Sequence, residues 1–243
     1  GITLDNATTS VVSVTAGGNL SGQHLAKVTL TLNADTTLPN TTAELPKAID
    51  ADDTHKITVP ESVDISGVVI TGGATTLSIA DDKNVQMAAS QYNTFTGILA
   101  SGSGETITLS GGGNVTADAD VETYDLGDDG RTITLGANSA QTITGGTTAD
   151  TLSVGGTTYT GDVSAVETIS MTTGGDIKGA NSGLATGATT VSLAGSVAMT
   201  ALQHAGFTTA IDATGGTDQI TLSGAGNVTA DADVETYDLG DDG

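Results

Sequence analysis

Two segments of this chain are almost identical, and this repeat constrains the fold more than any other feature. Residues 107–130 read ITLSGGGNVTADADVETYDLGDDG, and residues 220–243 read ITLSGAGNVTADADVETYDLGDDG. The two segments differ at one position, where Gly112 corresponds to Ala225. A repeat with a period of about 113 residues indicates that one structural unit is built twice, with neighbouring units packed on each other.

Weaker matches extend the repeat toward the N-terminus. Residues 87–95 match residues 199–207, and residues 76–80 match residues 190–194. The predicted organisation is therefore an N-terminal segment (1–17), a first unit with a diverged first half (18–130) and a second unit (131–243). We also expect the chain to be a fragment of a longer protein.

A shorter spacing lies inside the long repeat. The motif that begins at Glu105 recurs at Asp150 and again at Asp218. The triplet Val121-Glu-Thr recurs at Val166 and Val234, with the same two spacings. Both spacings fit multiples of about 22.6 residues, and the long repeat contains about five such lengths, so the spacings predict coils of that size.

Alternation of Thr or Ser with an aliphatic residue predicts β-strands. Such alternation puts the aliphatic side chains on one face and the hydroxyls on the other, and it accounts for the 45 threonines. The expected strands are 28–32, 56–59, 76–79, 106–109, 132–135, 151–154 and 190–193. Helix is expected only at 85–92 and 197–205.

These features predict an all-β fold, a parallel β-helix-like solenoid with short helical insertions. A narrow interior filled by small aliphatic side chains suits a chain with 2% aromatic residues. The alternative is a pair of tandem β-sandwich domains, because a domain of about 100 residues also fits the repeat.

Composition excludes several functional classes. The chain carries 6 basic and 29 acidic residues, a net charge of −23, so it lacks the Lys and Arg that bind a nucleic-acid backbone. It has no apolar run of about 18 residues, so we expect no transmembrane helix. With no cysteine, it has neither disulfides nor thiolate metal sites.

Two dense groups of carboxylates are the candidate metal ligands. Carboxylate and backbone oxygens at turns are the ligands that calcium prefers, and a divalent cation would relieve the repulsion within each group. The alternative is a solvated acidic surface that favours solubility. The candidate calcium ligands are Asp118, Asp120, Glu122, Asp125, Asp128 and Asp129 in the first copy, and Asp231, Asp233, Glu235, Asp238, Asp241 and Asp242 in the second.

Catalytic patterns are weak. The three histidines, His24, His55 and His204, lie far apart in the sequence, and no GxSxG motif is present. A polysaccharide-active β-helix enzyme would combine acidic residues and calcium with a basic residue. The candidate for this basic residue is Arg131, the only arginine in the chain. We expect a protein that is not an enzyme.

The tandem β units resemble a known class of bacterial protein. The phrases MTALQHAGFTTAIDATGGTDQITLSGAG and VETYDLGDDGRTITLGANSAQTITGG are similar in character to bacterial S-layer proteins and giant repetitive secreted adhesins of the RTX, type I-exported kind. Residues 145–156 also resemble one degenerate copy of the RTX nonapeptide, with Thr148 in place of its third glycine. The resemblance implies an extracellular location, calcium-dependent order and self-assembly.

The sequence therefore predicts a non-enzymatic, extracellular structural repeat protein of the bacterial cell surface. It would form part of a surface layer, a filament or an adhesin stalk, with further copies of itself as the partner in lateral or end-to-end assembly. The alternative function is a calcium- or glycan-binding adhesion module, with a cell-surface glycan as the partner, and a polysaccharide-active enzyme is the third possibility.

Overall fold

The structure is a computed structural model of the 243-residue chain. It describes residues 10–15, 17–51, 55–72, 75–180, 184 and 187–240. The chain forms stacked coils of a β-solenoid, about 11 turns in all, with very little helix. Two compact units are distinguished: unit 1 comprises Gly1–Gly112 with Asp120–Thr123, and unit 2 comprises Gly113–Ala119 with Tyr124–Gly243.

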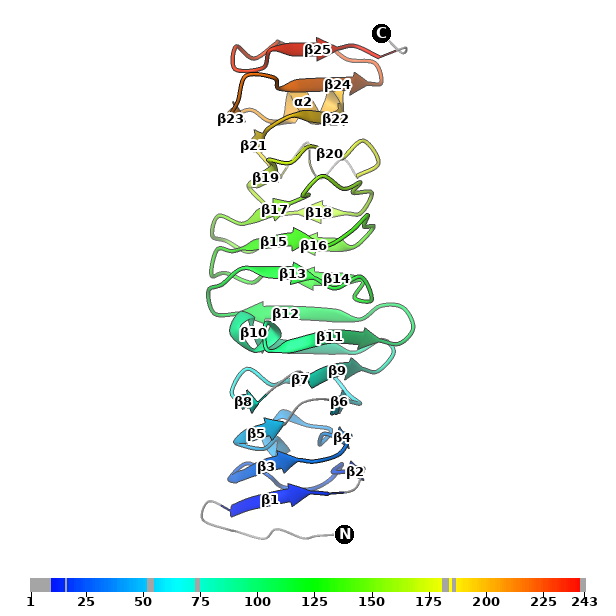
Figure 1. Ribbon diagram of the computed structural model, residues 1–243, viewed down its shortest axis with the longest axis vertical. Coiled ribbons are helices and arrows are strands. Elements are labelled where there is room, and N and C mark those ends of the chain that lie inside the picture. The colour runs from blue at the N-terminus through cyan, green and yellow to red at the C-terminus, as the bar shows by residue number, and fades with distance from the viewer. Residues whose placement is uncertain are drawn as a thin grey trace. The chain divides into compact units, whose positions relative to one another are not determined.

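Unit 1 is built from three groups of parallel strands (Figure 1). The first is β1 (Ser10–Val14), β3 (Val28–Leu32), β5 (Ala48–Ala51) and β8 (Val69–Gly72). The second is β2 (Gly18–Asn19), β4 (Thr36–Thr37), β6 (Lys56–Val59), β9 (Thr75–Ile79) and β11 (Phe95–Ala100). The third contains β7 (Val63–Asp64), β10 (Asn84–Ala88) and β12 (Thr106–Ser110). The helical turns are η1 (Thr42–Glu44) and α1 (Ala89–Tyr92).

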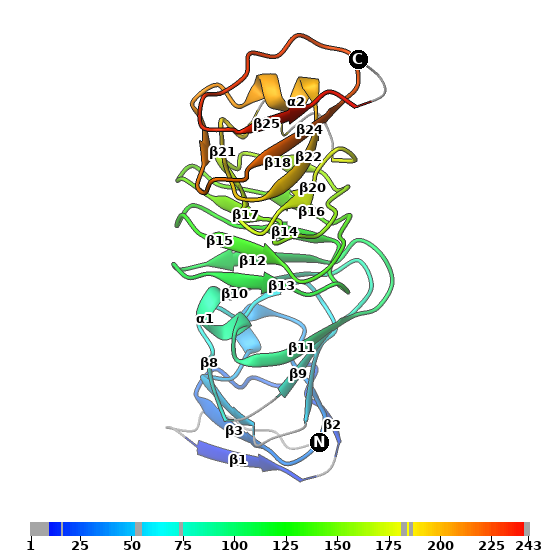
Figure 2. The ribbon, with the colours of Figure 1, turned by 45° about the horizontal axis from the view of Figure 1, so that its top comes forward.

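Unit 2 repeats this parallel arrangement. One sheet contains β13 (Val115–Ala117), β15 (Thr132–Leu135), β17 (Thr151–Ser153), β19 (Thr168–Met171), β21 (Thr190–Leu193) and β23 (Ala210–Ala213). A second group is β14 (Thr123–Asp125), β16 (Thr142–Thr144) and β18 (Val163–Ser164). In β14, the residues Tyr124 and Asp125 belong to unit 2. A third is β20 (Gly175–Asp176), β22 (Ser196–Thr200), β24 (Gln219–Ser223) and β25 (Thr236–Asp238), with helix α2 (Ala201–Gly206) after β22 (Figure 2).

The core consists of aliphatic side chains stacked from coil to coil. In the β15–β21 part of unit 2, four of them lie in register on consecutive coils and each is 0% exposed: Ile133, Leu152, Ile169 and Val191. The threonines beside them also pair in register, on the outer face of the same strands. The period-two pattern therefore fills the interior with one face of each strand and leaves the hydroxyls outside.

The β-solenoid prediction is confirmed, and the tandem-sandwich alternative is wrong because the strand pairs in the described part of the chain are parallel. The seven expected strands appear within one residue of their predicted ends. The expected helices are half wrong: residues 85–88 and 197–200 belong to strands β10 and β22, and only the following residues turn into helix. Val85 and Met87 alternate with polar residues, so the strand pattern takes precedence over the helical one.

The predicted coil length of about 22.6 residues is close to the average, since 243 residues form about 11 turns, but individual coils differ in length. The step along the chain from Thr151 to its partner Thr168 is shorter than the step from Ser196 to its partner Gln219. The three motif copies lie on strands of different sheets, β12, β17 and β24. Turns between strands absorb insertions, so a coil does not need a constant length to keep its strands in register. The repeat boundaries 18–130 and 131–243 describe the sequence and remain a prediction.

Replacing one core residue should weaken the stack. We expect Leu152→Ala to lower the free energy of unfolding by about 2–5 kcal/mol, because the truncated side chain leaves a cavity between two coils. Ser153→Ala, on the outer face of the same strand, should change it by less than about 0.5 kcal/mol. Urea denaturation measures the free energy of unfolding of both variants. Equal losses of stability in Leu152→Ala and Ser153→Ala would contradict the assignment of Leu152 to the interior.

Candidate functional site

The first acidic group lies between the end of strand β13 and the start of strand β15. Its six carboxylates are Asp118, Asp120, Glu122, Asp125, Asp128 and Asp129, of which Asp120 and Glu122 belong to unit 1 and the other four to unit 2. The group is therefore not a single cluster within either unit.

The unit 2 carboxylates make separate hydrogen bonds. Asp125 Oδ1 accepts the backbone N–H of Gly127 at 3.0 Å, which closes a turn. Asp128 Oδ1 accepts both the N–H and the hydroxyl of Thr147, at 2.9 and 3.0 Å, so it links its coil to the next one. Asp129 Oδ2 accepts Nη2 of Arg131 at 3.2 Å. These oxygens satisfy backbone and side-chain donors in three different places.

The second group behaves in the same way. It comprises Asp231, Asp233, Glu235 and Asp238, with Asp241 and Asp242 outside the described residues. Asp231 Oδ1 accepts the N–H of Asp233 at 3.0 Å, and Asp238 Oδ1 accepts the N–H of Gly240 at 3.0 Å. Within the described ranges, no three Asp, Glu or His side chains are placed to hold a metal ion. Calcium binding stays a prediction of the sequence.

A hydrogen bond between neighbouring coils recurs at three places. In each, the backbone N–H of a buried acidic residue donates to Oε2 of a glutamate on the next coil, at 2.8–3.2 Å. The three donor residues are at most 1% exposed. The pairs are Glu105–Glu122, Asp150–Glu167 and Asp218–Glu235. Each of these hydrogen bonds joins the first residue of the motif to the glutamate of the Val-Glu-Thr triplet. The motif and the triplet therefore recur with the same spacings.

Asp150 shows what the buried carboxylate does. Its Oδ1 accepts the N–H of Arg131 at 2.9 Å, and its Oδ2 accepts the N–H of Gly146 at 2.8 Å. A Cβ on Gly146 would lie 1.9 Å from the carbonyl oxygen of Gly127, so only glycine allows the coils to approach this closely. The aspartate and glycines of the RTX-like segment 145–156 therefore serve coil stacking here.

Glu105 differs from Asp150 because its carboxyl oxygens have no hydrogen-bond donor among the described residues. Two carboxyl groups can hydrogen-bond to each other only by sharing a proton. The side-chain hydrogen bond with Glu122, followed by burial, raises the pKa of Glu105 above its ordinary value of 4.5. Glu105 therefore keeps its proton to a higher pH than an isolated glutamate does.

Arg131 is a buried residue of unit 2. Its side chain is 0% exposed and its Nη2 contacts Asp129 at 3.2 Å. A basic group that acts on a polysaccharide must contact it from solvent, so this position does not suit the role that the enzyme alternative requires.

Helices α1 and α2 are each anchored by a buried glutamine, which the sequence analysis did not identify. Gln203 Nε2 donates to the carbonyl oxygens of Ile177 and Ala180, at 2.7 and 3.3 Å, while its Oε1 accepts the N–H of Thr200 at 2.8 Å. Gln91 makes the equivalent bonds to the preceding coil in unit 1. The repeated Met-x-Ala-x-Gln pattern was the available signal.

His204 is the only strongly buried histidine in the described chain, at 4% exposure. Its Nε2 lies 3.1 Å from the hydroxyl of Tyr237, and burial lowers the pKa of the imidazole. The same hydroxyl accepts the N–H of Asp231 at 2.8 Å, so it is free to donate its proton to the neutral ring. This contact joins helix α2 to strand β25 and gives His204 a packing role.

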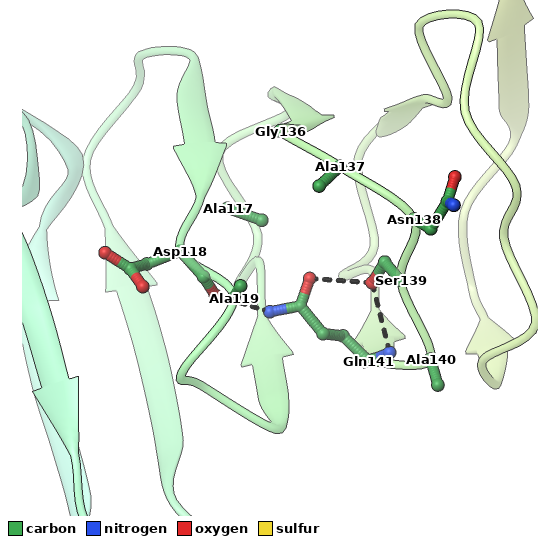
Figure 3. A pocket seen from close by; sticks show the side chains of 9 residues that line it. All are labelled: Ala117, Asp118, Ala119, Gly136, Ala137, Asn138, Ser139, Ala140 and Gln141. Carbon is green, nitrogen blue, oxygen red and sulfur yellow. Dashed lines mark hydrogen bonds between the residues drawn. The ribbon is translucent and has the colours of Figure 1, made fainter.

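A pocket of about 350 Å³ opens beside the first acidic group. Figure 3 shows its lining, residues 117–119 and 136–141, in which Gln141 bonds to Ser139 and to the carbonyl oxygen of Asp118. The lining side chains are small or already hydrogen-bonded, and Asp118 supplies the one carboxylate. The pocket therefore lacks a pair of acid and base groups or a nucleophile with its base.

Comparison with protein-family models, with characterised proteins and with solved structures finds no match to this chain. Among the described residues, no helix is long and apolar enough to cross a membrane.

The shared proton predicts an unusual pH dependence. A carboxyl whose folded-state pKa is raised stabilises the fold below its ordinary pKa, and this contribution is lost as the pH rises through the folded-state value. We expect Glu105→Gln to raise the melting temperature at pH 7, because an amide donates to Glu122 at every pH, with little change at pH 4. The control is Glu61→Gln, which makes the same substitution at an exposed glutamate paired with Lys83. This variant should not raise the melting temperature. Equal shifts at both pH values would contradict the shared proton.

Calcium binding has a direct thermal test. If calcium holds the acidic groups together, millimolar calcium raises the melting temperature and a chelator lowers it, because a ligand of the folded state stabilises that state. Magnesium at the same ionic strength is the control for screening. Identical melting curves in calcium and in chelator would remove the calcium prediction.

Proposed function

We propose that this protein is a non-enzymatic structural repeat protein of the bacterial cell surface. It would act outside the cell, as part of a surface layer, a filament or an adhesin stalk, through association with further copies of itself. The single observation that carries the proposal is the in-register stacking of coil on coil, seen for example along β15, β17, β19 and β21.

This architecture suits a spacer. Each coil is held by the coils next to it, so a chain of this kind lengthens by repetition without a new core. The near-identity of residues 107–130 and 220–243 is consistent with such lengthening. The outward threonine and serine side chains present a polar β-surface, while the charge of −23 opposes non-specific aggregation.

Polar side chains that join neighbouring coils also support a structural role. Asp150, Glu167 and Gln203 bond to the backbone of neighbouring coils. Polar groups that bond to the backbone in this way join one coil to the next. The pocket in Figure 3 and the buried Arg131 supply no arrangement that would favour catalysis over assembly.

Self-association can be tested directly on the purified chain. We expect ordered sheets or fibres in negative-stain electron microscopy, with and without calcium, at physiological salt. Far-UV circular dichroism of the same samples checks that the protein tested is folded. A folded protein that stays a monodisperse monomer by light scattering, at every calcium and salt concentration, would contradict the proposal.

A further inference from the structure

One outer face of unit 2 consists of hydroxyl side chains in two straight ranks. It belongs to four adjacent strands, β15, β17, β19 and β21, and we name it the hydroxyl face (Figure 1). The pairing passes from strand to strand without a shift of register, so each rank is continuous. The first rank is Thr132, Thr151, Thr168 and Thr190, and the second is Thr134, Ser153, Ser170 and Ser192.

Strand geometry fixes the spacing of this array. Neighbouring parallel strands lie about 4.8 Å apart, and this distance is the repeat along each rank. Residues i and i+2 of one strand lie about 6.7 Å apart, and this distance separates the two ranks. The hydroxyl face is therefore a nearly rectangular lattice with one hydroxyl group at each point.

The hydroxyl groups of this face are not used by the fold. All eight side chains are half-buried, and no hydrogen bond joins their hydroxyl groups to another described residue. Outward hydroxyls elsewhere do bond to the protein. Ser110 donates to the carbonyl oxygen of Met87 at 3.3 Å, and Thr71 donates to Oδ1 of Asp50 at 3.2 Å. The hydrogen-bonding capacity of the hydroxyl face is therefore left to whatever lies outside it.

The hydroxyl face also carries no charge, although the net charge of the chain is −23. Charged residues interrupt the threonines on other outer faces, where Lys56 pairs with Thr76 and Asp50 pairs with Thr71. On the strand that follows β21, Asp212 pairs with Ser192 and ends the second rank. Strand propensity accounts for threonine on an outer face. It does not account for two ranks that are free of charged residues.

The side chain of threonine combines two groups that order water. Its hydroxyl both donates and accepts a hydrogen bond, and its methyl group restricts the orientations of the water molecules beside it. Water molecules bound between the ranks therefore repeat with the spacing of the coils. Water held in this way bridges two surfaces almost as favourably as a direct hydrogen bond does.

The two repeats of the hydroxyl face are close to the two oxygen repeats on a prism plane of hexagonal ice. Such a plane is flat and uncharged, and it offers donors and acceptors in equal number. A face without charged groups contacts it without losing the hydration of an ion. A crystalline polysaccharide is the other flat lattice of this kind, but sugar rings pack on aromatic side chains, which the hydroxyl face lacks.

We propose that the hydroxyl face is an ice-binding site, which holds the protein on prism planes of ice through water ordered between its threonine and serine hydroxyls. Ice then grows only between the attached molecules, so the freezing temperature falls below the melting temperature. The lattice is recognised by the whole array, and one long charged side chain in its middle should prevent contact. This proposal rests on the register of unit 2 and not on self-association.

The growth of a single ice crystal tests the proposal on the full chain. The crystal is held in a solution of the purified protein, its shape is recorded, and the gap between its melting and freezing temperatures is measured. We expect the native chain to give a gap and a crystal with flat prism faces. Thr151→Lys, in the middle of the first rank, should lose both effects, because the lysine holds the face away from the ice.

Thr221→Lys is the matched control. Thr221 points outward from β24 of the same unit, where it pairs with Ala198 and Asp238, so it lies on a different face. This variant should keep the temperature gap and the crystal shape of the native chain. Ser170→Lys, in the second rank, disrupts the hydroxyl face at another point and should lose both effects. Circular dichroism melts check that the three variants are folded.

Several results would overturn the proposal. A folded native chain that leaves the shape and the freezing temperature of ice unchanged would show that the hydroxyl face does not bind ice. Equal loss in Thr151→Lys and Thr221→Lys, or no loss in Thr151→Lys and Ser170→Lys, would place any ice-binding site elsewhere. Binding of the native chain to crystalline cellulose or chitin, with no effect on ice, would make a polysaccharide the occupant. None of these results depends on whether the protein forms sheets or fibres.

Discussion

The backbone hydrogen bonds between successive coils are the interaction on which the rest of the structure depends. In a parallel ladder, each strand donates and accepts across both edges, so a coil is satisfied only when a neighbour lies on each side. The same ladder sets the aliphatic side chains of successive coils on top of each other. The stacking of Leu152 between Ile133 and Ile169 is thus a consequence of the register, and the register is stabilised by that stacking.

Buried carboxylates make a second set of connections between the coils. The carboxylate of Asp150 accepts backbone N–H groups from two other segments. The backbone N–H of Asp150 donates to Oε2 of Glu167. A buried acidic group is costly unless its oxygens are occupied, which ties the position of one coil to the next. Glu105 stands apart from Asp150, because its longer side chain meets Glu122, and this contact raises the pKa of the Glu105 carboxyl. Sequence copies of one motif can therefore differ in chemistry through one methylene group.

Several features of the fold could be predicted from residue patterns alone. Strands such as 28–32 and 132–135 follow from strict alternation, because the side-chain period of a strand is two. The helices could be placed only roughly, since α1 and α2 depend on Gln91 and Gln203 bonding to the preceding coil, which is distant in sequence. The acidic groups were predicted as metal ligands from their density. Which oxygens point together, and which accept a backbone N–H, is decided by contacts between coils that the spacing does not specify.

The sequence by itself determined the class of fold, the polarity of the two faces of each strand and the existence of a repeat. These follow from local chemistry, because β-branched and aliphatic residues at every second position favour a strand with one buried face. Only the tertiary structure decided the coil lengths, the occupation of each carboxylate and the exposure of Leu126 and Leu239. The same residues are buried in one copy and exposed in the other because burial belongs to the neighbouring coil and not to the residue.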